Sequence, residues 1–279
     1  FLPHVNVAAI AASLGTGTPV IVSERTNPAL DVDATRMQRL LRRVFYRFAD
    51  AVVIQTQSVE CAVRASAPGA ARFEVIPNPV PPALPVGRQF GSGAGRHRLV
   101  ACGRLVPEKQ FRELIEHFVR ISRERADWDL WIWGDGPEES ELRRTIDSLG
   151  QSGRVFIQGR TDDIWGEMLR ADIFVLVSAF EGFPNSLLEA MALGVPSVAF
   201  DCDFGPREIT GDGKDAMLVP ANDWPALENV LRELFDDPAS RAALGKKGAA
   251  AVREKFSLNH VLQRWASLFD TMTKLHRAR

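Results

Sequence analysis

Short apolar runs alternate with longer amphipathic stretches along almost the whole chain. Such alternation is typical of parallel β-sheets covered by helices on both faces. The sequence therefore predicts an α/β protein built from doubly wound, Rossmann-like parallel sheets. The runs predicted as strands are 19–23, 51–54, 73–76, 99–102, 129–133, 154–158, 172–177 and 196–200, and those predicted as helices are 34–49, 58–67, 109–124, 138–149, 185–193, 224–235, 239–255 and 258–275.

The alternation stops between residues 77 and 98, where proline and glycine dominate. Such a composition favours a linker, and although Gly91 to Gly95 weakly matches a phosphate-binding glycine loop, it neither follows a strong strand nor opens a helix. We predict a partial N-terminal Rossmann-like domain at 1–80, a linker at 81–97, a C-terminal Rossmann-like domain at 98–256, and a C-terminal helix at 257–279 that could cross back to the N-terminal domain. The first domain has only three predicted strands and opens within a helix, so we expect its first strands to be missing from this chain.

Composition excludes several classes of protein. Among 279 residues, 34 Lys and Arg face 35 Asp and Glu, for a net charge of −1. This balance argues against a protein that coats nucleic acid, which needs a dominant basic field. The three cysteines are far apart with no C-x-x-C, which argues against a disulfide framework or a structural zinc site and favours a reduced, cytoplasmic compartment. No apolar run reaches the length of a membrane span.

The most informative loop follows the predicted strand 172–177, at the carboxyl end where open α/β sheets bind ligands. Gly182 allows a sharp turn, and Pro184 is well placed to begin a helix whose first amides could bind a phosphate. Glu189 lies about one turn further along, and its two carboxylate oxygens suit a vicinal diol such as a ribose. Glu181, on the loop itself, could bind sugar hydroxyls or face developing positive charge. The alternative is a capped helix with two solvated glutamates.

Three other loops follow predicted strands in the same half of the chain, so all four should open onto one crevice. In the first of them, Arg104 and Lys109 offer cations to phosphate oxygens, and Gly103 allows a close backbone approach. A surface turn is the alternative for that segment. The other two loops are 134–137, reading Gly-Asp-Gly-Pro, and 159–160, reading Gly-Arg.

In this order and spacing, the segments 103–109, 134–137 and 181–189 resemble the signature of the retaining GT-B glycosyltransferases of family 4, the glycosyl transferases group 1, and in particular those that assemble bacterial polysaccharides and oligosaccharides. The resemblance implies two Rossmann-like domains facing a cleft, with a nucleotide-sugar held mainly by the C-terminal domain. It also implies transfer with retention, in which the leaving phosphate assists attack on the same face. Neither a cofactor nor a metal is expected.

The same resemblance implies roles for individual residues. Arg104 and Lys109 would bind the donor diphosphate, Glu189 would hold the ribose hydroxyls, and Glu181 would be the catalytic residue that contacts the transferred sugar. The full set of implied donor-binding residues is Gly103, Arg104, Lys109, Arg160, Gly182, Phe183, Asn185, Ser186, Leu187 and Glu189.

The N-terminal part departs from the family pattern. Many members carry an important histidine near the start of the helix that begins here around Pro3. His4 is close to that position but does not match its register, so a helix-start residue is the favoured interpretation over a cleft residue. Glu24 and Arg25 end a predicted strand, and we expect them to face the cleft and contact donor or acceptor.

Two further patterns admit two interpretations each. Asp201-Cys202-Asp203 spells D-x-D, which holds a metal in GT-A transferases, but a polar loop near the donor pocket is favoured here. Arginines 36, 39, 43 and 47 share one helix face, opposite an apolar stripe formed by Met37, Leu40, Leu41, Val44, Phe45 and Phe48. We favour the interpretation in which the arginines face solvent and the opposite apolar stripe packs on the core. The alternative is that the arginines bind anionic lipid head groups or an acceptor phosphate.

The function expected from the sequence is transfer of a hexose or N-acetylhexosamine from a nucleotide diphosphate sugar, expected to be UDP-linked, to a polyprenyl-linked or polysaccharide acceptor. We expect a cytoplasmic protein that could touch the inner face of an anionic membrane, and no nucleic-acid partner. Two alternatives stay open: an epimerase or phosphorylase of the same fold, or a fragment that binds nucleotide without transferring a sugar.

Overall fold

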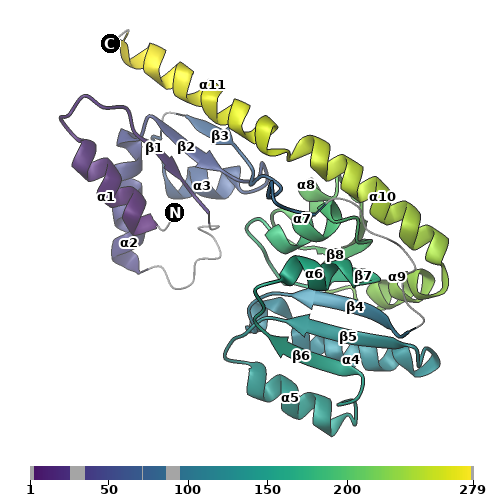
Figure 1. Cartoon of the computed structure of the whole chain (residues 1–279). Coiled ribbons are helices and arrows are strands. Elements are labelled where there is room, and N and C mark those ends of the chain that lie inside the picture. The colour runs from purple at the N-terminus through teal and green to yellow at the C-terminus, as the bar shows by residue number, and fades with distance from the viewer. Residues whose placement is uncertain (1–2, 26–34, 71, 86–94, 278–279) are drawn as a thin grey trace. The chain divides into compact units, whose positions relative to one another are not determined.

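The computed structural model describes residues 3–25, 35–70, 72–85 and 95–277 (Figure 1). The chain divides into two compact units, one made of Phe1–Pro79 and Phe256–Arg279 and the other of Val80–Lys255. We call them unit 1 and unit 2. Gly87, Gly91 and Gly93 of the predicted linker lie outside the described residues.

Unit 1 contains a three-stranded parallel sheet in the order β1 (Ile21–Ser23), β2 (Ala51–Ile54), β3 (Phe73–Val75). The chain's last helix packs on this sheet: Val261, Leu268 and Met272 are buried in one cluster with Ala51 and Val53 of β2. Their spacings of seven and four residues place these three side chains on one side of the helix. The helices of unit 1 are α1 (Pro3–Ser13), α2 (Arg36–Phe45), α3 (Glu60–Ser66) and α11 (Leu258–Arg277), and the 3-10 turn Tyr46–Phe48 follows α2.

Unit 2 contains a six-stranded, all-parallel sheet in the order β6-β5-β4-β7-β8-β9. From β4 the chain builds outward to β6, and it then returns to β7 on the other side of β4 and builds outward to β9. The direction of winding therefore reverses between β4 and β7, and open α/β sheets bind ligands at this switch point. The strands are β4 (His97–Cys102), β5 (Trp128–Trp133), β6 (Val155–Gly159), β7 (Ile173–Leu176), β8 (Ser197–Asp201) and β9 (Met217–Pro220).

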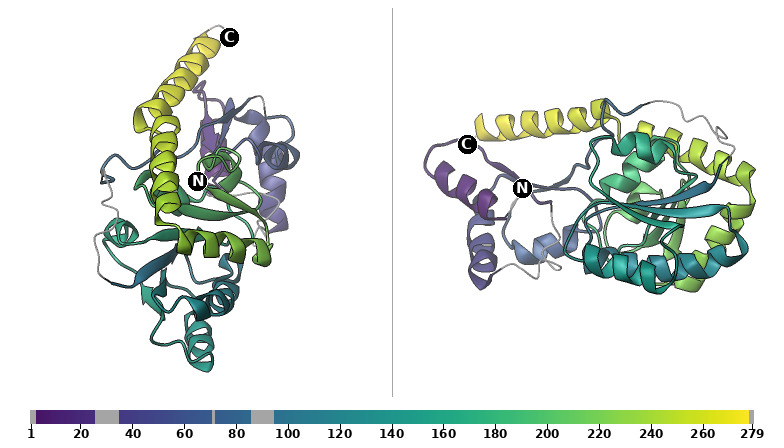
Figure 2. Two further views of the ribbon diagram at one scale, coloured as in Figure 1. Left: turned by 90° about the vertical axis from the view of Figure 1, so that its right-hand side faces the viewer. Right: turned by 60° about the horizontal axis from the view of Figure 1, so that its bottom comes forward.

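Helices cover both faces of this sheet (Figure 2). On one face, Leu114 and Phe118 of α4 share the main core with Leu227 and Leu231 of α9. On the other face, α7 packs on β7 and β8, and α10 packs behind α7. The helices of unit 2 are α4 (Phe111–Ile121), α5 (Glu139–Ser148), α6 (Ile164–Leu169), α7 (Asn185–Ala192), α8 (Pro206–Ile209), α9 (Trp224–Asp236) and α10 (Pro238–Lys255).

The helix predicted for residues 109–124 is interrupted near its start. Pro107–Lys109 forms a 3-10 turn, and Gln110 then takes a left-handed conformation with φ of 52° before α4 begins at Phe111. A non-glycine residue rarely adopts this conformation. The interruption separates Lys109 from the helix and makes it part of the loop that follows β4.

The predicted core stripe of α2 was wrong for three of its six residues, whereas Leu41, Val44 and Phe45 are half-buried. Met37 and Leu40 are 60% and 55% exposed, and Phe48 in the following 3-10 turn is also exposed. The buried face of this segment carries Arg42 and Tyr46 instead. The reason is that Asn6 of α1 and Glu24 after β1 supply buried polar partners, which attract Tyr46 and Arg42 toward the core.

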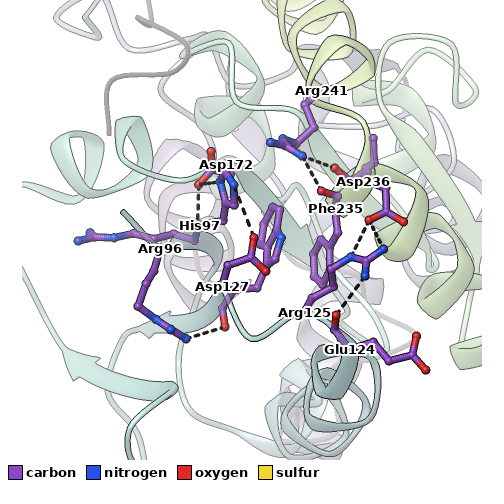
Figure 3. Close-up of polar contacts among 12 residues, drawn as sticks. Arg96, His97, Glu124, Arg125, Asp127, Asp172, Phe235, Asp236 and Arg241 are labelled. Atoms are coloured by element: carbon purple, nitrogen blue, oxygen red, sulfur yellow. Dashed lines mark hydrogen bonds and ion pairs between the residues drawn. The ribbon is translucent and has the colours of Figure 1, made fainter. Parts of the chain in front are cut away.

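Polar contacts join the residues at the amino-terminal ends of the strands of the large sheet (Figure 3). At the start of β4, His97 Nδ1 lies 3.3 Å from Asp172 Oδ2, and the ring stacks on Trp128. Arg96 binds Asp129 next to it, and Arg241 of α10 donates to the carbonyl oxygens of Leu234 and Phe235. Arg125 binds Asp236 of α9, and Trp128 stacks on Phe235 of α9, so α9 is held at the edge opposite the loops that carry the candidate site residues.

Candidate functional site

The loops after β4 and β5 are joined backbone to backbone. Gly103 N–H donates to Trp133 O over 3.0 Å, and Leu105 N–H donates to Asp135 O over 2.7 Å. Gly134 has a φ of +141°, and a β-carbon there would lie 1.8 Å from the Gly103 carbonyl oxygen. Only glycine fits this approach, so these two loops pack as one surface.

The neighbouring loops continue the same edge on both sides. Gly134 N–H donates to the carbonyl oxygen of Gly159, the last residue of β6, and Ala179 N–H after β7 donates to Glu108 O after β4. Glu181 N–H reaches Asp203 O after β8 over 3.3 Å. Five loops thus meet along the carboxyl edge of the sheet, and the loops after β4 and β7 meet at the switch point.

Lys109 and Glu181 form an ion pair at this junction. Lys109 Nζ lies 2.5 Å from Glu181 Oε1, and both side chains are mostly buried. The same carboxylate oxygen accepts from Ser178 Oγ over 2.7 Å, and Ser178 is 1% exposed. Sequence reasoning found Lys109 and Glu181 but missed Ser178, because a single serine at the end of a strand carries no pattern.

Glu189 lies on α7 and is held by one residue of α6. Trp165 Nε1 donates to Glu189 Oε2 over 3.0 Å. Burial raises the pKa of the Glu189 carboxyl above its usual value, and the Trp165 hydrogen bond opposes part of that rise. Trp165 was also missed, because the short helix α6 was not predicted.

Glu189 and Lys109 both lie beside the carboxyl end of β4. The thiol of Cys102, the last residue of β4, has its pKa raised by burial and further by the Glu189 charge. A β-carbon on the next residue, Gly103, would lie 3.5 Å from Cδ of Lys109. Glu189 and Lys109, which the sequence analysis singled out, therefore both lie near the last residues of β4.

The loop between β7 and α7 presents mainly backbone. Phe183 and Leu187 are buried side chains, whereas Asn185 is exposed and Ser186 is half-buried. Pro184 caps α7, and its carbonyl accepts from Leu187 and Leu188 N–H. Gly205 packs closely here, because a β-carbon on it would lie 2.5 Å from Pro184 Cδ.

Two predicted donor cations lie on the surface of unit 2. Arg104 is 75% exposed, with Glu108 at 3.7 Å, and Arg160 is 80% exposed and binds Asp135 over 3.0 Å. Neither arginine has a described contact with Lys109, Glu181 or Glu189. In the D-x-D segment, Asp201 binds Arg207.

The predicted residues of unit 1 divide between core and surface. Glu24 is 2% exposed, accepts from the Tyr46 hydroxyl, and lies 3.5 Å from Arg42 Nε. Burial raises the pKa of Glu24 despite the opposing effect of Arg42. Its carboxylate therefore belongs to a buried network and not to an open surface, contrary to the expectation that Glu24 faces a cleft. His4 and Arg25 are exposed.

Several known proteins are similar to this chain. The family model "Glycosyl transferases group 1" matches residues 88–251. An exopolysaccharide phosphotransferase of Streptomyces coelicolor is 36% identical over 80% of this chain and 23% of its own length. An α-1,4-N-acetyl-D-galactosaminyltransferase of Campylobacter jejuni, acting on a diNAcBac-PP-undecaprenol-linked glycan, is 28% identical over 96% of this chain and 72% of its own.

Among solved structures, Anabaena HepE in complex with UDP and glucose superposes with a TM-score of 0.85 at 21% identity, covering 97% of this chain and 76% of that one. The fold is therefore of the GT-B class. The chain belongs to the glycosyl transferases group 1 family. It spans about half the length of several curated relatives that it matches.

Proposed function

We propose that this chain transfers a hexose or N-acetylhexosamine, with retention of configuration, from a UDP-linked donor to a polyprenyl-linked or polysaccharide acceptor. The observation that carries this proposal is the convergence of Lys109 and Glu181 at the switch point of the large sheet, with Glu189 beside the end of β4. Family membership and the names of the relatives support the reaction class.

The donor diphosphate would bind Lys109 and the first amides of α7. An ammonium group forms strong charge-assisted hydrogen bonds to phosphate oxygens, and a helix N-terminus favours negative charge. Arg104, which extends into solvent from the same loop, would add a second cation on folding over the bound phosphates. Lys109 would then neutralise charge that develops on the leaving diphosphate, which is the role that a metal has in other transferases. No metal or cofactor is part of this proposal.

Glu181 would act on the transferred sugar. Ser178 and Lys109 both engage its Oε1, so the carboxylate is fixed in orientation before substrate arrives. A fixed carboxylate next to the diphosphate site can accept hydrogen bonds from sugar hydroxyls and stabilise positive charge near the anomeric carbon. Glu189 would accept hydrogen bonds from the ribose hydroxyls.

We also infer peripheral contact of unit 1 with an anionic, cytoplasmic membrane face. Arg36, Arg39 and Arg43 share the exposed face of α2 with Met37 and Leu40. Cations beside exposed apolar side chains suit a lipid surface. Among the described helices, none is both long and apolar enough to cross a bilayer. Co-sedimentation with vesicles rich in phosphatidylglycerol, compared between the wild type and Arg39→Glu/Arg43→Glu, tests the contact; equal sedimentation would contradict it.

A transfer assay tests the reaction. The chain is incubated with UDP-glucose or UDP-N-acetylhexosamine and a polyprenyl-diphosphate-linked sugar, and the product linkage is assigned by NMR. We expect an α-linked product from an α-linked donor, and loss of transfer in Glu181→Gln. UDP binding without any transfer would instead favour the nucleotide-binding alternative, and a product of inverted configuration would contradict retention.

A further inference from the structure

In each of the two glutamates of the site, one carboxylate oxygen is hydrogen-bonded by neighbouring side chains. Glu181 Oε1 is engaged by Ser178 and Lys109, and Glu189 Oε2 is engaged by the Trp165 indole N–H. Within the described residues, Glu189 Oε1 accepts no hydrogen bond from another side chain. The Glu189 carboxylate therefore has one oxygen fixed by the protein and one oxygen left for another donor.

Trp165 is placed to restrict this carboxylate. It is the second residue of α6, and Asp163 fixes the start of that helix by accepting from Gly166 N–H over 2.9 Å. α6 packs against α7, which carries Glu189. The indole N–H can only donate a hydrogen bond, so in this pair the carboxylate oxygen is always the acceptor.

We propose that Trp165 is a positioning residue for Glu189, holding Oε2 so that Oε1 meets the vicinal hydroxyls of a ribose and discriminates ribonucleotides from deoxyribonucleotides. The role rests on the proposed function, because the ligand of Glu189 is the nucleotide of the donor. It adds a residue from outside the loops that carry the family motifs.

The same hydrogen bond affects the charge of Glu189. A carboxylate is a better acceptor of two hydroxyl protons than a neutral acid, which has given up one acceptor site. Burial raises the pKa of Glu189, and the Trp165 N–H lowers it again by stabilising the charged form. Removal of the N–H therefore raises the pKa further, so that nucleotide binding is lost at a higher pH as the solution is acidified.

Other charged groups on the elements around α7 are engaged elsewhere. On α6, Glu167 binds Arg170 and lies 3.6 Å from Arg98; on α10, Arg253 donates to the Ala192 carbonyl. On α8, Arg207 binds Asp201. Burial and the Glu189 charge raise the pKa of the Cys102 thiol on β4, so that this thiol is neutral near pH 7. Trp165 is therefore the neighbour expected to dominate the titration of Glu189.

The experiment compares Trp165→Phe with Trp131→Phe. Trp131 lies on β5 and packs on Phe156, and its buried Nε1 has no hydrogen-bond partner among the described residues. Trp131→Phe therefore makes the same change of ring size as Trp165→Phe but removes no donated hydrogen bond. Binding of UDP and of 2′-deoxy-UDP is measured by calorimetry between pH 5 and 8. We expect Trp165→Phe to weaken UDP binding about tenfold, as for loss of one hydrogen bond to a charged group. Binding of 2′-deoxy-UDP, which keeps only one of the two hydroxyls, should weaken distinctly less, and the pH midpoint should move upward. Trp131→Phe should do neither.

Equal weakening of both nucleotides with an unchanged midpoint would reduce Trp165 to a packing residue and overturn the proposal. The pKa of Glu189 is also measured by NMR on the unliganded proteins, where Trp165→Phe should raise it and Trp131→Phe should not. If the wild type bound no nucleotide, the proposed function would fail, while this titration would still report whether Trp165 controls Glu189. An unchanged Glu189 pKa in Trp165→Phe would overturn the proposal even where nucleotide binding is normal.

Discussion

Lys109 Nζ and Glu181 Oε1 lie 2.5 Å apart, although 72 residues separate them in the chain. The two residues belong to the loops after β4 and β7, the neighbouring strands between which the sheet reverses its winding. A cation suited to phosphate and an acid suited to a sugar are thereby brought together by topology. The donor site proposed here depends on this pair.

Replacement of Lys109 by Met should weaken UDP binding by about ten- to a hundredfold, because a hydrogen bond to a charged group contributes about 1.5–3 kcal/mol. Uridine, which has no phosphate, should bind Lys109→Met as it binds the wild type. Calorimetry with both ligands measures the difference. Lys255→Met is the control, because Lys255 also forms an ion pair, with Asp215, but lies on α10. An equal loss of UDP affinity in both variants, or an equal loss of uridine affinity in Lys109→Met, would show that Lys109 does not bind the phosphates.

Replacement of Gly134 by Ala should destabilise unit 2 by about 3 kcal/mol or more, because the new methyl group would overlap the Gly103 carbonyl oxygen in a backbone conformation that favours glycine. Gly153→Ala should change stability by less than about 0.5 kcal/mol, since nothing lies within 4 Å of a β-carbon there. Denaturant unfolding compares the two variants. A Gly134→Ala protein as stable as Gly153→Ala would mean that the loops after β4 and β5 are not packed as described.

Only Cys61 should react quickly with a thiol reagent at pH 8. Cys61 is exposed, whereas Cys102 and Cys202 are buried. Burial raises the pKa of Cys202 to about 12, with Glu181 adding to the rise and Lys109 opposing it. Because the thiolate is the reactive form, a pKa far above 8 leaves Cys202 as an unreactive neutral thiol. We expect one fast thiol in the native protein and three in denaturant; three fast thiols without denaturant would contradict the burial of the strand ends.

Replacement of Tyr46 by Phe should destabilise the chain by about 2–3 kcal/mol at neutral pH, since it removes the hydroxyl that donates to Glu24 and accepts from Asn6. The pKa of Glu24 is raised in the folded state, so its protonated form contributes stability that is lost as the pH rises through the folded-state pKa. Tyr46→Phe removes a bond that favours the charged form, so its defect should be larger at neutral pH than at acidic pH. Arg47→Gln, an exposed neighbour, is the control. A defect that did not change with pH would separate Tyr46 from the titration of Glu24.

The fold was largely predictable because its strands are short, buried and rich in β-branched residues. Strand β2 was predicted with its observed ends, and β5, β7 and β8 to within one residue at each end. Helices α6 and α8 and strand β9 were missed, because four to six residues are too few to show a hydrophobic period. The exposure of Met37 and Leu40 was missed for a different reason: the burial of Arg42 and Tyr46 depends on partners far away in the sequence.

The candidate site was predictable only in its motifs. Lys109 follows one predicted strand, and Glu181 and Glu189 follow another. This placement indicated a shared edge, since parallel strands end on the same side of a sheet. Ser178 and Trp165 gave no such signal, because each acts through one side-chain contact that exists only in the folded chain. Glu24 also follows a strand, as Glu181 does, yet it lies buried because Arg42 of α2 and Tyr46 of the following 3-10 turn supply its partners.

A crystal structure of the chain with UDP tests the central claim most directly. The account predicts the diphosphate within hydrogen-bonding distance of Lys109 Nζ and of the first amides of α7, and the ribose on Glu189. Binding of UDP at a place that touches neither Lys109 nor Glu189, with the Lys109–Glu181 pair intact, would contradict it.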